Sequence, residues 1–262
     1  MRIGIDVGIS STKIAAIENG EIQRLELWEG MGYDENSIRN MLSIFDFHPT
    51  GFSVTGVGSQ AVGTEVLGIP AIHVDEFTAN AQAARNVLPE TPCIAVCIGT
   101  GTSFVRVDKE GHQHLGGSAL GGGALNGLIA GMLPGRSFSE FLSLADTGDL
   151  SRIDLQIKDV SRQALPNLPM DTTASNLYKR PHNDNPADIA AGIVNLILQN
   201  IGVMAHLAGS GIGIHDFVLM GRLAMLPGCK EIASRLEQLY GIHIQIPKFP
   251  VFQTAIGAAL TE

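Results

Sequence analysis

Basic residues are few in this chain and form no cluster. Lysine and arginine together number 17 in 262 residues, against 26 aspartates and glutamates, so the formal net charge is -9 at pH 7. A surface that binds nucleic acid needs clustered lysine and arginine to contact the phosphates. We therefore expect no nucleic-acid partner.

Cysteine is also scarce. The chain has three cysteines without Cys-x-x-Cys spacing, a pattern that argues against a disulfide framework and indicates a reducing compartment. Cys93 and Cys97 lie in the apolar stretch PCIAVCIG, so both face one side of a strand, and buried small hydrophobes are favoured over ligands. Arg2 is followed at once by a strand pattern and Asp6, with no signal-peptide core. We expect a cytoplasmic protein.

A long uninterrupted apolar run is missing as well. The longest candidate, 189–209, is broken by Asn195, Gln199, Asn200 and His206. Polar side chains at this frequency are costly inside a bilayer. We expect a core helix here and no membrane partner.

What the sequence does contain is an α/β pattern with an internal repeat. The segments 2–17 and 93–107 each consist of an apolar strand, a polar turn with glycine and a second strand. This repeat predicts two similar lobes, each a mixed sheet flanked by helices, with a cleft between them. Further strands are expected at 21–28, 51–59, 68–77, 216–221 and 243–247, and helices at 34–45, 78–88, 116–133 (after its glycine-rich turn), 137–149, 185–209, 230–241 and 252–262. The stretch 163–187, with four prolines, is expected to be a loop or lid.

The turn of the first repeat, GISSTK, combines glycine, hydroxyls and a lysine. Backbone N–H groups in such a turn can form a concave anion site, and Lys13 adds a positive charge beside it. Asp6, at the end of the first strand, is placed to hold Mg²⁺ directly or through water. A turn whose polar residues simply face water is the alternative.

The turn of the second repeat, IGTGTS, has two glycines that let a ligand approach the backbone and hydroxyls that can bind it. Two such turns, one leading each lobe, suit a clamp for the phosphates of a nucleotide. A third candidate is the glycine run 121–123, because three glycines at a helix start are expected to leave unpaired N–H groups that can hold a nucleotide or phosphate. Close packing of that helix is an equal alternative.

The segment HVDEF supplies carboxylates at the end of an apolar strand. Glu76 is a candidate general base for a substrate hydroxyl, and the alternative is that Asp75 or Glu76 only caps the following helix. His112 and His114 have the spacing of a chelating pair, but no further cluster completes a tetrahedral metal site. Turn-exposed histidines are therefore favoured.

Taken in order, several segments resemble the type II pantothenate kinases, members of the actin-like/Hsp70/sugar-kinase superfamily. They are GIDVGISSTK, HVDEF, IGTGTS, LGGSALGGGALNGL, LSLADTGDLSRIDLQIKDV, MDTTASN and AIGAAL, and they cover nearly the whole chain. The resemblance implies an α/β actin-like ATPase (ribonuclease H-like) fold with ATP in the cleft. It implies an N-terminal lobe over 1–75 and a larger C-terminal lobe over 76–262, whose last helix packs back on the first. It also implies a homodimer that phosphorylates pantothenate with MgATP, the first step of coenzyme A biosynthesis.

The resemblance also assigns roles to individual residues. Glu76 matches the catalytic base, and Asp6 matches the magnesium ligand. The nucleotide-binding positions are Asp6, Gly8, Ser10, Ser11, Thr12, Lys13, Thr100, Gly101, Thr102, Gly121, Gly122, Gly123, Asn126, Phe138, Gly221 and Arg222. The substrate-binding positions are His114, Gly116, Gly117, Thr173 and Ser175. For the last two, which lie in MDTTASN, a helix cap is the alternative.

The chain departs from the family pattern at several positions, one of which is Asn176-Leu177-Tyr178 in place of Asn-Phe-Gly. Ile9 replaces the second glycine of the first loop, and a β-branched residue does not adopt the φ > 0 geometry open to glycine. His114 stands where the family commonly has arginine, a better receptor for a carboxylate than neutral imidazole. Arg222 replaces a serine.

Another hydroxyl compound, such as a sugar or amino sugar, is therefore an alternative acceptor. The opening GIDVGISSTK also resembles the dehydratase activators, ATPases with a cysteine-bound iron–sulfur cluster. That interpretation is disfavoured, because Cys93 and Cys97 are expected on a buried strand and Cys229 stands alone.

Overall fold

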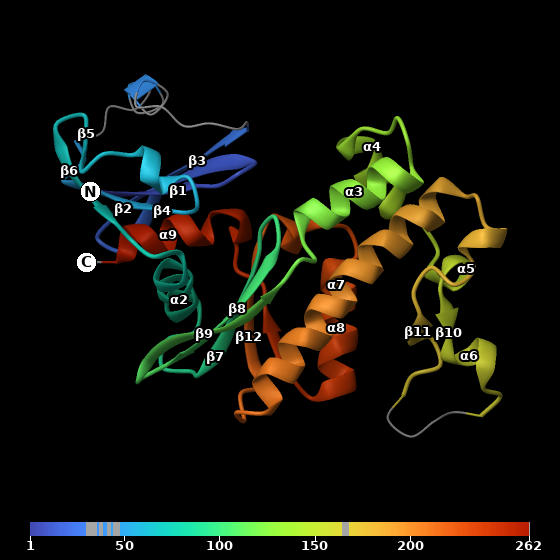
Figure 1. Cartoon of the computed structure of the whole chain (residues 1–262). Coiled ribbons are helices and arrows are strands. Elements are labelled where there is room, and N and C mark those ends of the chain that lie inside the picture. Colours follow the sequence, from blue (N-terminus) through green and yellow to red (C-terminus); the bar gives the residue numbers. More distant parts are fainter. Residues whose placement is uncertain (30–35, 37–38, 41–42, 44–47, 164–167, 262) are drawn as a thin grey trace.

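The structure is a computed structural model of the whole chain, and it describes residues 1–29, 36, 39–40, 43, 48–163 and 168–261. Its two larger β-sheets have helices packed on them, and a further small sheet has two strands (Figure 1). The helix expected over 34–45 lies largely outside the described residues.

The first sheet consists of β1 (Arg2–Val7), β2 (Ser11–Glu18), β3 (Glu21–Glu29), β4 (Gly51–Thr55), β5 (Glu65–Val66) and β6 (Ile69–His73). Its strand order is β3-β2-β1-β4-β6-β5. The strands β1, β2 and β3 pair antiparallel in succession, whereas β1, β4 and β6 run parallel. A short 3-10 helix, Ser59–Ala61, follows β4.

The second sheet consists of β7 (Cys93–Ile98), β8 (Thr102–Asp108), β9 (Gly111–Ser118), β12 (Asp216–Gly221) and β13 (His243–Gln245). Its strand order is β13-β12-β7-β8-β9. The strands β7, β8 and β9 pair antiparallel, and β7, β12 and β13 run parallel. The same succession of pairings therefore occurs in both sheets, which confirms the two similar mixed sheets predicted from the repeat.

Strand β9 was not expected from the sequence. The prediction that His112 and His114 lie in a turn is wrong, because both belong to this strand, although both side chains are exposed. The segment GHQHLGGS contains none of the β-branched or aromatic residues that mark strands. Its pairing with β8 forms the strand instead.

The larger helices are α2 (Glu76–Val87), α3 (Gly122–Met132), α4 (Phe138–Ala145), α7 (Pro186–Ser210), α8 (Cys229–Tyr240) and α9 (Gln253–Leu260). Helix α9 packs closely on the first sheet, because a Cβ at Gly4 would overlap the backbone of Ala255. It packs equally closely on α2, where a Cβ at Gly257 would overlap the carbonyl oxygen of Ala79. The last helix thus joins α2 to the first sheet, while the division of the chain at residue 75 stays a prediction.

Helix α7 is the central helix of the larger lobe. Asn185 caps it by accepting from the Ala187 N–H at 2.9 Å, and Pro186 occupies its first turn, in agreement with the helix expected from residue 185. Among the described helices α7 alone is long and apolar enough to cross a membrane, but 61% of its most apolar window is buried inside the molecule. Core helices pass the same test of length and composition.

A small subdomain is built from α5 (Leu150–Ile153), β10 (Leu155–Gln156), α6 (Ile157–Val160), β11 (Thr173–Ser175) and the 3-10 helix Arg180–His182. The fully buried Asp154 carboxylate organises it. It accepts hydrogen bonds from the Leu177 N–H at 2.7 Å, from the Thr173 hydroxyl at 3.0 Å and from the Asn195 amide at 2.7 Å.

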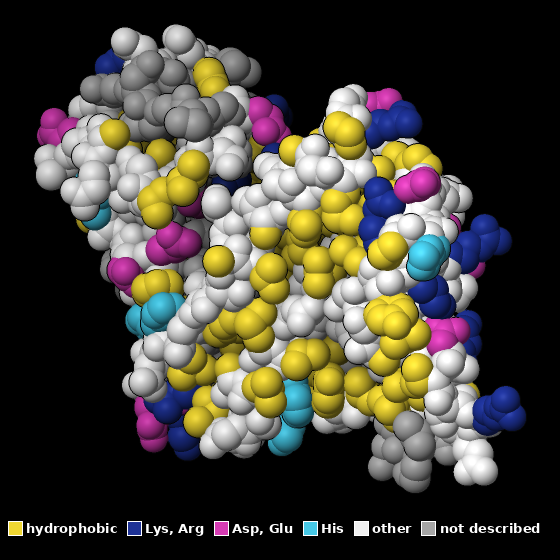
Figure 2. Space-filling view, turned by 45° about the vertical axis from the view of Figure 1, so that its right-hand side comes forward, with side chains coloured by type: hydrophobic (Ala, Val, Ile, Leu, Met, Phe, Trp, Pro, Cys, Tyr) yellow, Lys and Arg dark blue, Asp and Glu magenta, His cyan; other side chains and the backbone are white. Residues whose placement is uncertain are grey.

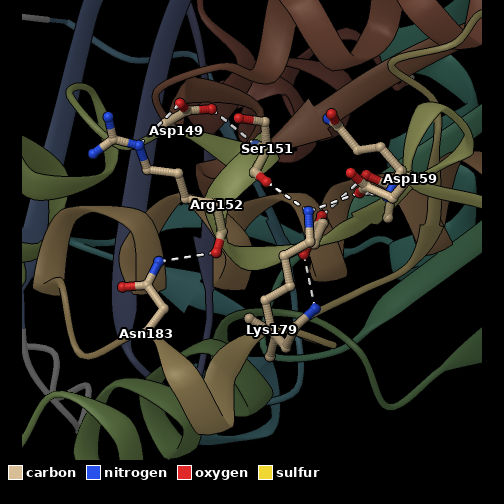
Figure 3. A network of polar contacts seen from close by, with 10 residues as sticks. Asp149, Ser151, Arg152, Asp159, Lys179 and Asn183 are labelled. Atoms are coloured by element: carbon tan, nitrogen blue, oxygen red, sulfur yellow. Dashed lines mark hydrogen bonds and ion pairs between the residues drawn. The ribbon is translucent and has the colours of Figure 1, made fainter.

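The chain after β11 is tied to α5 and α6. The Lys179 ammonium donates to the Ser151 carbonyl oxygen at 2.7 Å and pairs with Asp159 at 2.7 Å (Figure 3). Asn183 donates to the Arg152 carbonyl oxygen at 3.0 Å. The described part of 163–187 therefore includes a strand and a 3-10 helix held by polar contacts, where a loop was expected.

Candidate active site

A row of polar side chains lies at the carboxyl ends of β1 and β4. Lys13, Asp6 and Thr55 are neighbours across β2, β1 and β4. The Lys13 Nζ lies 3.2 Å from an Asp6 carboxylate oxygen, and both side chains are largely buried. Burial raises the pKa of Asp6, and the charge of Lys13 opposes this shift. Because Thr55 also has a buried hydroxyl without a hydrogen-bond partner among the described residues, this row can accept a further polar ligand.

The first turn accommodates isoleucine in place of the expected glycine. The Gly8 N–H donates to the Ser11 carbonyl oxygen at 3.1 Å and closes the turn. Ile9 is 52% exposed and does not have a positive φ, so it causes no strain in the backbone. Ser10 is exposed, whereas Ser11 and Thr12 are buried within β2. Of the three predicted hydroxyl groups, that of Ser10 is therefore the exposed one.

The two carboxylates of HVDEF have separate positions in the structure. Asp75 is the N-cap of α2 and accepts from the N–H groups of Phe77 and Thr78 at 3.0 and 3.1 Å. Glu76 begins the helix, is partly buried, and makes no hydrogen bond or ion pair within the described part of the chain. Its pKa is raised by burial first and then by the Asp6 carboxylate, is lowered by Lys13, and is raised further by Asp75. Glu76 thus has an uncommitted carboxylate beside the Asp6–Lys13 pair.

The end of β7 in the second sheet faces the same carboxylates. Burial and then the Glu76 carboxylate raise the pKa of Cys97 to about 12. The hydrogen bond to Thr254 lowers this pKa slightly, and the Asp6 carboxylate raises it slightly. The thiol contacts the Thr254 hydroxyl at 3.7 Å, and that hydroxyl donates to the Asn80 side chain at 2.8 Å. A thiol held protonated in this way is a poor nucleophile or metal ligand. Cys97, near the end of β7, is therefore a residue of the second sheet that lies near Glu76.

The glycine-rich segment packs directly on the second turn. The N–H groups of Gly122 and Gly123 donate to the carbonyl oxygens of Gly99 and Thr100 at 2.8 and 2.9 Å. A Cβ at Gly121 would lie 2.6 Å from the Thr100 carbonyl oxygen. The expectation that the N–H groups of Gly122 and Gly123 are unpaired is therefore wrong, since the turn already uses them. Close backbone packing is the role that the structure shows for these glycines.

Other predicted nucleotide residues differ in how accessible they are. Thr102 is buried, and its hydroxyl donates to the Leu120 carbonyl oxygen at 2.7 Å. Thr100 and Asn126 are exposed beside the glycine segment. A Cβ at Gly101 would lie 2.8 Å from the Ser118 carbonyl oxygen, so this position has no room for a side chain. The Thr102 hydroxyl is thus committed within the fold.

Gly221, Arg222 and Phe138 lie together at the carboxyl end of β12. Gly221 has φ 98°, and a Cβ there would overlap the carbonyl oxygen of Ile98. Arg222 begins the 3-10 helix Arg222–Met225, and its guanidinium carbon lies 5.5 Å from the ring centroid of Phe138. The structure therefore brings these three predicted nucleotide residues into one group.

The five predicted substrate residues separate into two groups. His114 stacks on Phe77 with ring centroids 4.0 Å apart, next to Glu76, and Gly116 and Gly117 follow it on β9. Thr173 and Ser175 lie on β11, which Figure 1 shows at the opposite side of the molecule from α2. The structure does not bring these two residues to Glu76 within one chain.

Sequence reasoning did not identify Thr55, Phe77 or Glu29 as candidates. Thr55 is the last residue of β4 and is followed by Gly56, just as Asp6 lies near the end of β1 shortly before Gly8. The segment VTGVG therefore contained a signal that could have identified Thr55 as a polar residue at a strand end. Phe77 becomes a candidate because its ring stacks on His114, and Glu29 because it forms an ion pair with Arg222. No short-range pattern connects those pairs.

The site thus lies between two lobes, and the space-filling view shows the notch between them (Figure 2). Asp6, Lys13 and Glu76 come from the first sheet and the start of α2, while the second turn, the glycine segment and Gly221 come from the second sheet and α3. Among the described residues, no group of three or more His, Cys, Asp or Glu side chains has the arrangement of a protein-only metal site. The arrangement suits a ligand with phosphates that reaches from the turns toward Glu76.

Comparisons with solved structures identify the fold. The activator of 2-hydroxyisocaproyl-CoA dehydratase from Clostridium difficile, solved with bound ADPNP, has a TM-score of 0.69 and 18% identity, and the match covers 99% of this chain and 92% of that one. The ROK hexokinase from Thermus thermophilus has a TM-score of 0.58 and 13% identity, with 98% and 96% coverage. At these identities the likeness concerns the fold alone, and it confirms the actin-like ATPase fold expected from the sequence.

Comparisons with sequences identify the family. A type II pantothenate kinase from Staphylococcus haemolyticus is 28% identical over 272 residues, covering 98% of both chains. One from Oceanobacillus iheyensis is 27% identical over 226 residues, covering 84% of this chain and 83% of that protein. The model of the Fumble family matches residues 60–226, more than half of the chain. The resemblance recognised in the sequence is thereby confirmed, and the chain belongs to the Fumble family, that of the type II pantothenate kinases.

Proposed function

We propose that this protein transfers the γ-phosphoryl group of ATP to the hydroxyl group of pantothenate, the first step of coenzyme A biosynthesis. The relatives named type II pantothenate kinase support this activity. The structural observation that carries it is the position of Glu76. Its carboxylate is left uncommitted because Asp75 caps the helix, and it lies beside the Asp6–Lys13 pair.

Glu76 acts in this proposal as the general base. It accepts the proton of the attacking hydroxyl as the oxygen–phosphorus bond forms. Its raised pKa makes it a stronger base than an ordinary glutamate while it still releases the proton afterwards. Lys13 stabilises the negative charge that develops on the transferred phosphoryl oxygens.

ATP is proposed to lie across the second turn with its adenine toward Phe138 and Gly221. The close packing of Gly121 on Thr100 fixes the shape of that surface, and the exposed backbone of the turn is open to phosphates. Closure of the two lobes over ATP excludes water and so limits its hydrolysis.

Mg²⁺ fits the polar row at Asp6. This ion is commonly held by one or two carboxylates together with the phosphates of the nucleotide, so the absence of a larger acidic cluster among the described residues is compatible with it. Asp6 would hold the ion directly or through water, and the unpartnered Thr55 hydroxyl is a neighbouring polar group for that water. When bound, Mg²⁺ neutralises charge on the phosphates.

The acceptor is the part of this proposal with a specific alternative. The stacked pair of Phe77 and His114 next to Glu76 provides an aromatic wall and an imidazole where the family commonly has a guanidinium. A sugar or amino sugar, which has no carboxylate to be bound, is the second candidate acceptor that this substitution favours.

His114→Arg is expected to lower the KM for pantothenate about five- to thirtyfold, because one charge-assisted hydrogen bond contributes about 1–2 kcal/mol beyond a neutral one. His114→Lys is the matched control, since it adds the charge without the planar fork. The measurement is ADP release against pantothenate concentration. If His114→Arg left the KM for pantothenate unchanged, the carboxylate of pantothenate would not bind at residue 114.

The proposal itself is tested by ADP release from ATP in the presence of pantothenate and of a panel of sugars and amino sugars. Stimulation by pantothenate supports it. Stimulation by a sugar without any by pantothenate would establish the second candidate instead.

We also propose a cytoplasmic homodimer. The free cysteines Cys93, Cys97 and Cys229 suit a reducing compartment. Hydrophobic side chains gather on the face of the larger lobe in Figure 2, and Leu207 of α7 is 63% exposed, which favours a covering partner. Light scattering from the purified chain would show the mass of two chains if this is correct and that of one chain if it is not.

A further inference from the structure

An ion pair joins the two lobes at the nucleotide side of the cleft. Arg222 follows the last residue of β12 in the second sheet, and Glu29 is the last residue of β3 in the first sheet. The Arg222 Nη2 lies 2.9 Å from Glu29 Oε1, and Nη1 donates to Glu29 Oε2 at 3.2 Å. Two parallel contacts of this kind fix the relative orientation of both groups.

The backbone and the neighbouring ring hold Arg222 in place. Its neighbour Gly221 has φ 98° and no room for a side chain, so the chain makes one defined turn there. The guanidinium lies over the Phe138 ring at 5.5 Å. Arg222 therefore lies between the proposed adenine site and the opposite lobe.

We propose that Arg222 and Glu29 form a positioning pair that closes the nucleotide side of the cleft and slows nucleotide release. The inference rests on the proposed function of the cleft as an ATP site. The lobes cannot separate at this edge without breaking the pair, so opening requires its two charges to part. Because the side chains are 44% and 58% exposed, water can solvate both charges, and the pair opens reversibly.

Breaking the pair is expected to weaken the binding of ATP and ADP alike. An exposed ion pair supports a change of about three- to fivefold in the dissociation constant. The change should appear in the KM for ATP and not in the KM for the acceptor, because the pair lies on the nucleotide side. It should shrink when the salt concentration rises from about 0.05 M to about 0.5 M, since salt screens exposed charges.

The experiment measures ATP and ADP binding by calorimetry for the full-length protein and four variants. Arg222→Gln and Glu29→Gln each remove one charge, and the double variant Arg222→Glu with Glu29→Arg reverses the pair. Arg136→Gln is the matched control. Arg136 is 46% exposed and pairs with Glu140 inside the same lobe at 3.7 Å, so its loss does not affect closure.

The proposal predicts that both single variants weaken binding to a similar extent, that the reversed pair recovers at least half of the loss, and that Arg136→Gln binds like the parent. Two results overturn it. One is unchanged binding in both single variants. The other is a loss in Arg222→Gln alone with no recovery in the reversed pair, which would mean that Arg222 contacts the nucleotide without Glu29. Failure of the unaltered protein to bind ATP would instead contradict the proposed function.

Discussion

Glu76→Gln is expected to lower the rate of pantothenate-dependent ADP release about 10²–10⁴-fold, the usual contribution of a general base. The substitution keeps the size of the side chain and its place at the start of α2. It removes the group that accepts the proton of the hydroxyl. Binding of ATP should remain within a few-fold of the parent, because Glu76 is proposed to contact the acceptor. Coupled measurement of ADP release together with calorimetry of ATP binding separates the two effects.

The pH dependence provides the control for this prediction. Burial, Asp6 and Asp75 raise the pKa of Glu76, with Lys13 opposing. The carboxylate is the active form, so activity is present above this raised pKa and is lost as the pH falls through it. The acid limb should therefore lie at a higher pH than the ordinary glutamate value. Asp75→Asn keeps an N-cap residue but removes a charge that raises the pKa of Glu76, so the limb should move to lower pH. Full activity in Glu76→Gln would show that another group is the base.

Gly121→Ala is expected to lower the free energy of unfolding by about 1–3 kcal/mol, the usual cost of overpacking where neighbours cannot move, and to weaken ATP binding because the second turn is displaced. A Cβ at this position would lie 2.6 Å from the Thr100 carbonyl oxygen and 2.8 Å from Gly101 Cα. Both are backbone atoms of the second turn, so the turn itself would have to shift. The φ of Gly121 is 170°, an extended value open to any residue, which leaves steric overlap as the cause. Calorimetry of ATP binding measures the effect.

Gly127→Ala, inside α3, is the matched control for Gly121, the N-cap residue of that helix. Among the described residues a Cβ at Gly127 has no neighbour within 4 Å beyond its own helix, and alanine is a better helix former than glycine by about 1 kcal/mol. This variant should bind ATP normally and melt at the same or a higher temperature. Equal losses in the two variants would mean that α3 as a whole, and not the contact at Gly121, controls binding.

The sequence was sufficient for the repeated part of the fold. Residues 2–17 and 93–107 have strong strand patterns separated by short polar turns, and local signals of this kind predict hairpins well. The helix expected at 137–149 begins at a capping box of Ser137 and Glu140, whose spacing is a local signal of a helix start. The strand β9 and the small strands around Asp154 escaped prediction. Strand β9 lacks β-branched and aromatic residues, although it pairs with the neighbouring β8. The small strands depend on residues distant in the chain, such as Asn195, whose amide donates to Asp154 at 2.7 Å.

The candidate site was predictable in its residues but less so in their roles. The segment HVDEF indicated a carboxylate at the start of a helix, yet the sequence left open which of Asp75 and Glu76 caps it, because either residue type can do so. Likewise, GGG at a helix start fits both a phosphate site and close packing. The hydrogen bonds from Gly122 and Gly123 to the second turn decide for close packing at those two N–H groups.

Thr173 shows the limit of transferring roles by motif. The segment MDTTASN matches the family, but the Thr173 hydroxyl donates to the buried Asp154 carboxylate at 3.0 Å. Its strand lies away from Glu76 within one chain (Figure 1). A role in the substrate site stays a prediction, whereas its contact within the subdomain is part of the structure.

The most direct test of the central proposal is to identify the product formed by the unaltered protein from ATP, Mg²⁺ and pantothenate by mass spectrometry. The proposal predicts 4′-phosphopantothenate in an amount equal to the ADP released, and none when pantothenate is omitted. ADP release without a phosphorylated pantothenate would contradict it.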